Sequence, residues 1–276
     1  MYSMTRVSGR SLRPLGLRKE LFEMVLSLRA CGLSYNQIIK RVEQNEGAVL
    51  SKSQVSYWLN GKHRPDGSVR RFEPVPSFEI GYVTGVALGD GTTSVSSDHN
   101  YAIKLQVNDE EFAEEFARCL GVILHRPPPN VRWWEARRAW RTQVSSLLLM
   151  QFLRRPLSIV GPIIQRTRDC KVGFLKGFFD SEGSVSKDTV SVSNGELAKL
   201  EFVIELLGSL EIQTTGPHLG YPAGGTRIIR GKLCRVNKAM YYVRVRNESI
   251  RRFQEIVGFS IRRKIEALAE HRAMDP

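Results

Sequence analysis

The chain has 276 residues and 42% hydrophobic content, so it can bury a sizeable core, and its length suggests two or three domains. Its formal net charge of +13 favours polyanionic partners. No stretch predicts a transmembrane helix, no basic amphipathic helix indicates a membrane surface, and the N-terminus lacks an apolar signal core. We therefore expect no membrane partner and an intracellular protein, cytoplasmic and associated with the nucleoid.

The cysteines and histidines do not predict a zinc site. Cys31, Cys119, Cys170 and Cys234 form no Cys-x-x-Cys pair, and the five histidines are equally scattered. A structural zinc site needs such ligands at short spacings. We expect reduced, mostly buried thiols, and histidines that are structural or face phosphates.

The first quarter of the chain predicts a small all-α domain over residues 1–61. An apolar helix face begins at Leu21, and Ser-x-x-Gln caps at Ser34 and Ser51 begin a second and a third helix, which ends at Gly61. Up to Pro76 the chain has 13 basic and 6 acidic residues, so this region is strongly basic. Residues 62–76 are predicted to form a linker.

Three short helices in this order resemble a helix-turn-helix domain, in which the last helix enters the major groove of DNA. The candidate DNA contacts are Lys52, Ser53, Gln54, Ser56, Tyr57, Asn60, Lys62 and Arg64. The Arg6–Arg13 segment is a candidate minor-groove arm. The Gln44–Leu50 connection is longer than the usual turn, and a plain three-helix bundle with a solvated basic face is the alternative.

The next stretch, from Gly81 to Gly91, occurs a second time from Gly173 to Gly183. In each copy small residues recur at every fourth position, and an acid and a glycine then follow. Residues four apart lie on one helix face, and small residues there let two helix backbones approach closely. We predict two buried helices packed stripe to stripe. If they are parallel, Asp90 and Glu182 meet at the same end.

Two carboxylates at helix C-termini are disfavoured by the helix dipoles and by each other. A hard divalent cation between Asp90 and Glu182 would account for the arrangement, since Mg²⁺ is usually held by one or two carboxylates, waters and substrate phosphate. Ordinary Asp-Gly and Glu-Gly turns that end each helix are the alternative. Because the acid occurs at the same position in both copies, the metal site is favoured over ordinary turns.

The two stretches resemble the paired motifs of single-chain LAGLIDADG homing endonucleases over roughly residues 78–270. The resemblance places Asp90 and Glu182 at the metal-binding acid positions. Leu88 stands where the family name has its first Asp, whereas Asp180 keeps that acid in the second copy. Glu182 replaces an Asp. Both copies therefore keep an acid at the metal-binding position, directly before the final glycine. Asp180 is expected to be structural.

The elements after each motif predict an α+β fold with the order αββαββα in two pseudo-symmetric halves, at residues 77–154 and 169–276, forming a saddle-shaped antiparallel sheet. Residues 155–168 are the predicted link between the halves. In the first half we predict strands at 92–96, 101–107 and twice within 123–144, and helices at 109–120 and 145–153. In the second half we predict strands at 183–186, 189–193, 213–219, 227–236 and 241–245, and helices at 196–210, 248–257 and 261–270.

Basic residues in both halves predict contact with nucleic acid, because strands with alternate polar and basic residues suit a groove. They are Arg132, Arg137, Arg138 and Arg141 in the first half, and Arg227, Arg230, Lys232, Arg235, Lys238, Arg244 and Arg246 in the second. For any one of them a solvated face is the alternative. The neighbouring Trp133, Trp134 and Trp140 are expected in the core.

The family resemblance implies a monomer that hydrolyses both strands of a long asymmetric duplex site and leaves 3′ overhangs. It implies Mg²⁺ (or Mn²⁺) on Asp90 and Glu182, with the carbonyl oxygens of Gly89 and Ser181 as further candidate ligands. It also implies basic or polar residues beside the metals. The candidates are Lys104, Asn108, Lys187 and Asn194, of which Lys104 and Asn194 are assigned catalytic roles.

A non-cleaving nucleic-acid binder of the same fold is the alternative, either an RNA-splicing maturase with intron RNA as its partner or a transcription regulator. The presence of both acids favours the enzyme. A purely structural basic protein explains the charge but not the duplicated acids.

Overall fold

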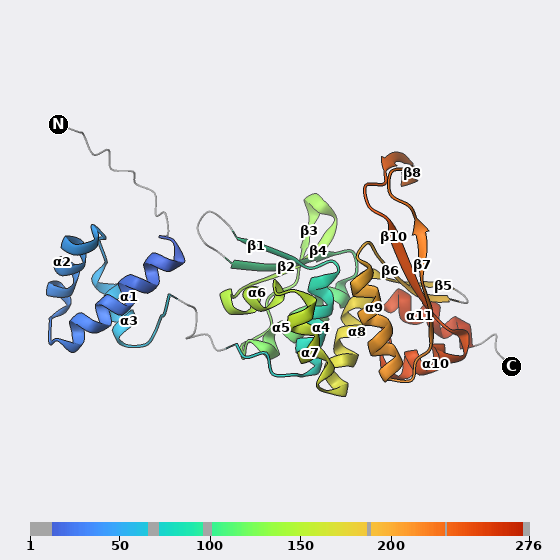
Figure 1. The fold of residues 1–276 in the computed structure, drawn as a ribbon, viewed down its shortest axis with the longest axis horizontal. Helices are drawn as coiled ribbons and strands as arrows, with labels where there is room; N and C mark the ends of the chain where they lie inside the picture. Colours follow the sequence, from blue (N-terminus) through green and yellow to red (C-terminus); the bar gives the residue numbers. More distant parts are fainter. Residues whose placement is uncertain (1–12, 66–71, 96–100, 187–188, 230, 273–276) are drawn as a thin grey trace. The chain divides into compact units, whose positions relative to one another are not determined.

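The structure is a computed structural model that describes residues 13–65, 72–95, 101–186, 189–229 and 231–272 (Figure 1). Contacts divide the chain into two compact units. The described residues of 1–72, 93–102 and 145–151 form one unit, and those of 73–92, 103–144 and 152–272 form the other. The domain boundaries that the sequence predicts stay predictions.

The N-terminal region consists of the helices α1 (Leu15–Ala30), α2 (Tyr35–Glu46) and α3 (Lys52–Leu59). Their buried faces form one cluster that includes Val25, Val42 and Trp58. Ser34 makes the predicted capping box with Gln37, and the Ser51 side chain accepts a hydrogen bond from the Gln54 backbone. The all-α prediction is confirmed, whereas the helix-turn-helix assignment stays a prediction.

The rest of the chain repeats one order of elements. The first set is α4 (Phe78–Leu88), β1 (Thr92–Val95), β2 (Tyr101–Val107), α5 (Glu110–Ile123), β3 (Arg132–Trp134), η1 (Glu135–Arg137), β4 (Ala139–Ser145) and α6 (Leu147–Leu153). After α7 (Leu157–Gln165) the second set is α8 (Arg168–Glu182), β5 (Gly183–Ser186), β6 (Thr189–Asn194), α9 (Leu197–Ser209), β7 (Thr214–Tyr221), β8 (Thr226–Ile229), β9 (Lys232–Arg235), β10 (Met240–Val245), α10 (Asn247–Ile256) and α11 (Arg262–Arg272).

Each set builds a four-stranded sheet with the same topology. The strand orders are β1-β2-β4-β3 and β5-β6-β10-β7, so in both the last strand lies between the second and the third. In the second sheet β10 pairs antiparallel with β6, and Val243 lies opposite Val192 and Arg244 opposite Ser191. The valines are buried and Arg244 is exposed, as a sheet with one covered face requires. The predicted α+β repeat is confirmed.

Two features differ from the sequence prediction. The run predicted as one strand at 227–236 is a hairpin of β8 and β9, which form a two-stranded sheet. Gly231, between the two strands, has a φ of 76°. A positive φ is easy for glycine, so the chain can turn back there. Figure 1 places this hairpin at the end of β7 and β10 remote from α10. The predicted link 155–168 contains the helix α7.

Two of the three cysteines whose side chains are described, Cys119 and Cys170, are buried and free, while Cys31 is exposed and free. Burial raises the pKa of the Cys170 thiol to about 11. Within the described residues no single helix is long and apolar enough to cross a bilayer, but the bent pair α6 and α7 meets that criterion by length and composition.

Candidate active site

The helices α4 and α8 touch along the predicted glycine stripes. A Cβ atom on Gly85 would lie 2.2 Å from the carbonyl oxygen of Phe174, and one on Gly177 would lie 2.3 Å from that of Tyr82. Only glycine fits at either position, because real Cβ atoms do not approach backbone oxygens so closely. Gly81, Gly85 and Gly89 lie nearest to Cys170, Phe174 and Ser181 in that order. The contacts advance in the same direction along both helices, so the helices are parallel and the packing prediction is confirmed.

The parallel helices bring the two acids to the same end. A Cβ atom on Gly89 would lie 3.2 Å from Cγ of Glu182, and Asp90 follows Gly89 directly. The carboxyl groups are close enough for the charge of Asp90 to raise the pKa of Glu182. The predicted meeting of Asp90 and Glu182 is therefore confirmed.

Glu182 is held by a neighbour that the sequence also pointed to. The Asn194 side chain donates a hydrogen bond from Nδ2 to Oε1 of Glu182 (3.1 Å), and its Oδ1 accepts one from the Glu196 backbone (2.9 Å). Burial and then the charge of Asp90 raise the pKa of Glu182, and Lys199, Asn194 and Lys264 oppose that shift. Asn194 is buried, so its amide is fixed toward the acid.

Asp90 lies at a cavity of about 380 Å³. The cavity is lined by Asp90, Gln106, Val107, Asn108, Asp109, Phe112, Asp180, Ser181, Gly183, Ser184, Val185, Arg263, Lys264 and Ala267. Although Asp90 as a residue is solvent-exposed, desolvation of its carboxyl group raises its pKa, and the charge of Lys264 opposes that shift. Polar side chains thus line the same cavity as Asp90, and the cavity has room for a ligand.

The candidates Lys104 and Asn108 are placed differently. Asn108 lines the cavity of Asp90, but Lys104 does not; the β2 residues that do are Val107 and the polar Gln106, which the sequence reasoning missed. Residues 104 and 106 point to the same side of a strand, so the period-2 pattern could have suggested Gln106. Lys187 lies outside the described residues.

Two lysines that the sequence reasoning missed reach the acid-bearing helices. Lys264 is 5% exposed, and its ammonium donates hydrogen bonds to the carbonyl oxygens of Phe179 (2.9 Å) and Asp180 (2.8 Å) in α8. Burial lowers the pKa of Lys264 to about 8. Lys199 donates to the carbonyl oxygen of Leu88 (3.0 Å), the last residue of α4.

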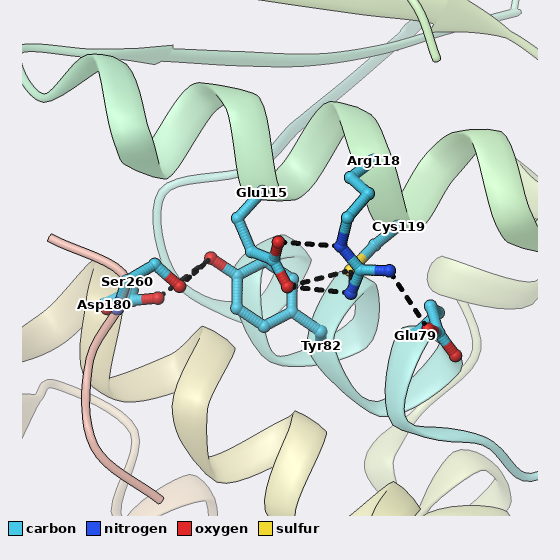
Figure 2. A network of polar contacts seen from close by, with 7 residues as sticks. All are labelled: Glu79, Tyr82, Glu115, Arg118, Cys119, Asp180 and Ser260. Atoms are coloured by element: carbon cyan, nitrogen blue, oxygen red, sulfur yellow. Dashed lines mark hydrogen bonds and ion pairs between the residues drawn. The ribbon is translucent and has the colours of Figure 1, made fainter. Parts of the chain in front are cut away.

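Asp180, expected to be structural, has a hydrogen-bond partner within the protein on each of its carboxylate oxygens. The Tyr82 hydroxyl donates to its Oδ2 (2.8 Å), and the Ser260 backbone N–H donates to its Oδ1 (2.9 Å). Figure 2 shows the Tyr82 hydroxyl pointing toward Asp180 and Ser260. It also shows Arg118 of α5 between Glu115 of the same helix and Glu79 of α4. Asp180 therefore ties α8 to α4 and to the Ser260 loop.

The donor set at the helix ends fits a hard cation. It consists of two carboxylates, each preceded in the chain by a residue whose backbone carbonyl is a candidate ligand, Gly89 or Ser181. The acids and these two residues carry no thiol or imidazole. Mg²⁺ and Mn²⁺ favour such oxygen ligands and keep several waters, whereas structural zinc sites use Cys and His. Across the described residues no group of three or more His, Cys, Asp and Glu side chains converges, so a cation here would complete its shell with water and substrate oxygens.

The predicted basic contacts are mostly on the surface. Arg132, Arg137 and Arg138 are exposed and Arg141 is half-buried, all in the segment from β3 to β4; Arg235, Lys238, Arg244 and Arg246 are exposed in the second half. The side chains of Arg227 and Lys232, and the whole of Arg230, lie outside the described residues. In the N-terminal region Lys52, Ser53, Tyr57, Asn60, Lys62 and Arg64 are exposed, and Gln54 and Ser56 are half-buried.

The expectation that the tryptophans lie in the core is wrong for two of them. Trp133 and Trp134 are 44% and 37% exposed, and Trp140 is half-buried. Trp133 packs edge-on against Trp140, and the guanidinium of Arg141 lies 5.2 Å from the Trp134 ring centroid. The short strand β3 forms the edge of its sheet, so its side chains have few neighbours to bury them.

The predicted minor-groove arm is only partly within the described residues. Arg6 and Arg10 lie outside them. Arg13 donates a hydrogen bond to the carbonyl oxygen of Val49 (3.0 Å), so its guanidinium already has a partner within the N-terminal region.

Comparisons with known proteins identify a family and several relatives. A family model described as a LAGLIDADG-like domain matches residues 169–258. The chain is 31% identical over 252 residues to uncharacterized protein MJ0398 of Methanocaldococcus jannaschii, which covers 90% of this chain and 92% of that protein. It is 27% identical to homing endonuclease I-ApeI of Aeropyrum pernix, over 66% of this chain and 88% of that protein. The crystal structure of I-DmoI with DNA and Ca aligns at a TM-score of 0.49 and 15% identity, over 72% of this chain and 100% of that chain.

Two repeated α+β halves whose first helices pack on glycines and end in acids define a two-motif protein of the LAGLIDADG type. The family model matches only the second half, which contains the motif copy that keeps Asp180. The similarity to MJ0398 runs over 90% of the chain and so includes the first half as well. The chain belongs to the LAGLIDADG homing endonuclease family.

Proposed function

We propose that the chain is a site-specific endonuclease that cleaves both strands of double-stranded DNA with Mg²⁺ or Mn²⁺ and leaves 3′ overhangs. The observation that carries the proposal is the contact of α4 and α8, which brings Asp90 and Glu182 together at one end. The homing endonuclease name of I-ApeI and the DNA and Mn named for the I-DmoI crystal structure support it.

Each residue at the helix ends has a distinct role in this proposal. Asp90 and Glu182 would hold the metal, with the carbonyl oxygens of Gly89 and Ser181 as further candidate ligands. Bound metal would activate a water and stabilise the charge on the phosphate and on the leaving oxygen. Asn194 keeps the Glu182 carboxylate turned toward the site through its hydrogen bond.

The cavity beside Asp90 provides the remaining polar groups. Gln106 and Asn108 line it, and an amide there can orient a water or a phosphate oxygen. Lys104 on the same strand is proposed as a basic group that approaches the phosphate.

The exposed bases are proposed to bind the DNA backbone, since phosphate contacts fix a protein on the duplex and base contacts select the sequence. Arg132, Arg137, Arg138 and Arg141 act in the first half, and Arg227, Arg230, Lys232, Arg235, Lys238, Arg244 and Arg246 in the second. A single chain with two unlike halves suits an asymmetric site, so we propose a monomer that acts on nucleoid DNA in the cytoplasm.

The N-terminal region is proposed to add DNA contacts of its own. Between Gly47 and Pro65 the sequence has no acid, and Lys52, Ser53 and Tyr57 of α3 are exposed. Gln54 joins them on this helix, and Lys62 and Arg64 follow it. A polar helix without acids suits the major groove, which presents hydrogen-bonding base edges within an anionic backbone.

The test uses a supercoiled plasmid that carries the DNA flanking the gene. With Mg²⁺ the wild-type chain should linearise it, and Asp90→Asn or Glu182→Gln should abolish cleavage while gel-shift binding in Ca²⁺ persists. Glu201→Gln removes an exposed acid on α9 and is the matched control, which should cut like wild type. Undiminished cleavage by either active-site variant would remove the assigned site.

Binding without cleavage by the wild-type chain would favour the non-cleaving alternative. Binding to the intron RNA in a filter assay would then indicate a maturase, and binding only to duplex upstream of the gene would indicate a transcription regulator.

A further inference from the structure

Each acid-bearing helix ends against a lysine ammonium from elsewhere in the second half. Lys264 of α11 donates to the carbonyl oxygens of Phe179 and Asp180 at 2.9 and 2.8 Å, in the last turn of α8. Lys199 of α9 donates to the carbonyl oxygen of Leu88 at 3.0 Å, where α4 ends. The last carbonyls of a helix lack helical partners and carry the negative end of its dipole.

We infer that Lys264 and Lys199 are positioning residues for the acid pair: each binds carbonyl oxygens at the C-terminal end of one acid-bearing helix and thereby fixes the carboxylate that follows. The inference rests on the proposed function, since it concerns the residues proposed to hold the metal. It assigns the placement of both acids, including that of the first half, to side chains of the second half.

The burial of Lys264 indicates more than a packing role. Its residue is 5% exposed, and a buried ammonium is costly unless it has partners. The charges that face it are Asp180, Asp109 and Asp90, opposed by Arg263. Arg263 is itself engaged by Asp109, with Nε to Oδ1 at 2.8 Å and Nη2 to Oδ2 at 2.9 Å. A methionine would fill the same space without desolvating a charge.

Lys199 is the weaker member of the pair. Its side chain is 17% exposed and also forms an ion pair with Glu196 at 3.0 Å. It makes one bond to α4, where Lys264 makes two to α8. Loss of Lys199 should therefore disturb the site less than loss of Lys264.

Two roles for Lys264 predict opposite changes in metal affinity. If the ammonium served only as a counter-charge to the acids, its removal would leave the site more negative and tighten the binding of a cation. If it holds the end of α8, its removal frees Glu182 and weakens binding. Loss of a group that orients metal ligands typically costs 10–100-fold in metal affinity.

The experiment measures Mn²⁺ binding to the full-length protein without DNA, from the electron paramagnetic resonance signal of free Mn²⁺. Lys264→Met should weaken binding by about tenfold or more. Lys264→Arg, which keeps the charge and the donors, should recover part of the loss, and Lys199→Met should show a smaller loss. Lys40→Met, on the exposed face of α2, is the control and should bind like wild type.

A folded Lys264→Met that binds Mn²⁺ as tightly as wild type, or more tightly, would overturn the inference. If that variant does not fold, Lys264→Arg and Lys199→Met decide: wild-type affinity in Lys199→Met together with no loss in Lys264→Arg would also overturn it. Asp90→Asn and Glu182→Gln separate the two proposals. If these variants keep Mn²⁺ binding, the metal site fails; if they lose it while the lysine variants keep it, only the positioning role fails.

Discussion

Asp90 and Glu182 follow helices of the same kind, yet their surroundings differ. Glu182 is half-buried and accepts a hydrogen bond from the fixed amide of Asn194. Asp90 is exposed at the cavity, and Lys264 is the charge that acts on its pKa. Two copies of one motif thus place their acids in different surroundings within one site: Glu182 is held by a side chain, whereas Asp90 faces the cavity.

The close contact of α4 and α8 brings the two acids together. A single added methyl group should break that contact. A Cβ on Gly85 would lie 2.2 Å from a backbone oxygen, so Gly85→Ala must push the helices apart. We expect a loss of about 3 kcal/mol or more in the free energy of unfolding, measured by urea denaturation, together with loss of cleavage.

Gly208→Ala is the matched control for that variant. Gly208 lies in α9, and a Cβ there would meet no atom within 4 Å. The substitution should stabilise the chain by about 0.5–1 kcal/mol, because alanine loses less backbone entropy in a helix. A neutral Gly85→Ala beside this control would contradict the glycine contact.

The two asparagines should sharpen the difference between the acids. Asn194→Ala removes the bond to Glu182 and should lower the cleavage rate by about tenfold or more, as loss of a ligand-orienting group does. Asn108→Ala removes an exposed amide from the cavity of Asp90 and should cost less. The measurement is single-turnover cleavage at saturating Mg²⁺. A larger loss in Asn108→Ala would reverse the assigned asymmetry.

Local patterns in the sequence were enough to predict the glycine contact and the meeting of the acids, because helix periodicity fixes which residues share a face. The lysines at the helix ends could not be predicted in this way. Lys199 and Leu88 are 111 residues apart, and the partner atom is a backbone carbonyl that carries no signature in the sequence. The prediction that Trp133 is buried rested on its residue type, which is commonly buried. Trp133 is exposed because it lies on an edge strand.

The acids should also make stability depend on pH. Burial raises the pKa of both carboxyls, and the charge of Asp90 raises that of Glu182 further. Because the folded-state pKa lies above the unfolded one, protonation favours the folded chain. This stabilisation is complete below the unfolded pKa and is lost as pH rises through the folded pKa.

Urea denaturation of the metal-free protein tests the effect, at pH values from below the unfolded-state pKa of the two acids to above their folded-state pKa. Stability should fall with rising pH more steeply in wild type than in Asp90→Asn or Glu182→Gln. Added Mg²⁺ should reverse the loss in wild type, because it binds the ionised folded state. Parallel pH profiles in wild type and both variants would contradict the raised pKa values.

The smallest expected effect concerns the exposed face of the second sheet. Arg244 lies on β10 opposite Ser191, and its guanidinium is 4.9 Å from the Tyr242 ring centroid. If it neutralises one phosphate, Arg244→Ala should reduce the slope of log affinity against log salt by about 0.9. Arg251→Ala is the control, since Arg251 lies on α10 and pairs with Glu255 at 3.0 Å. Equal slopes for both variants in a DNA-binding titration in Ca²⁺ would remove Arg244 from the DNA contact surface. The same measurement on Arg138→Ala would show whether the first half contributes as much as the second.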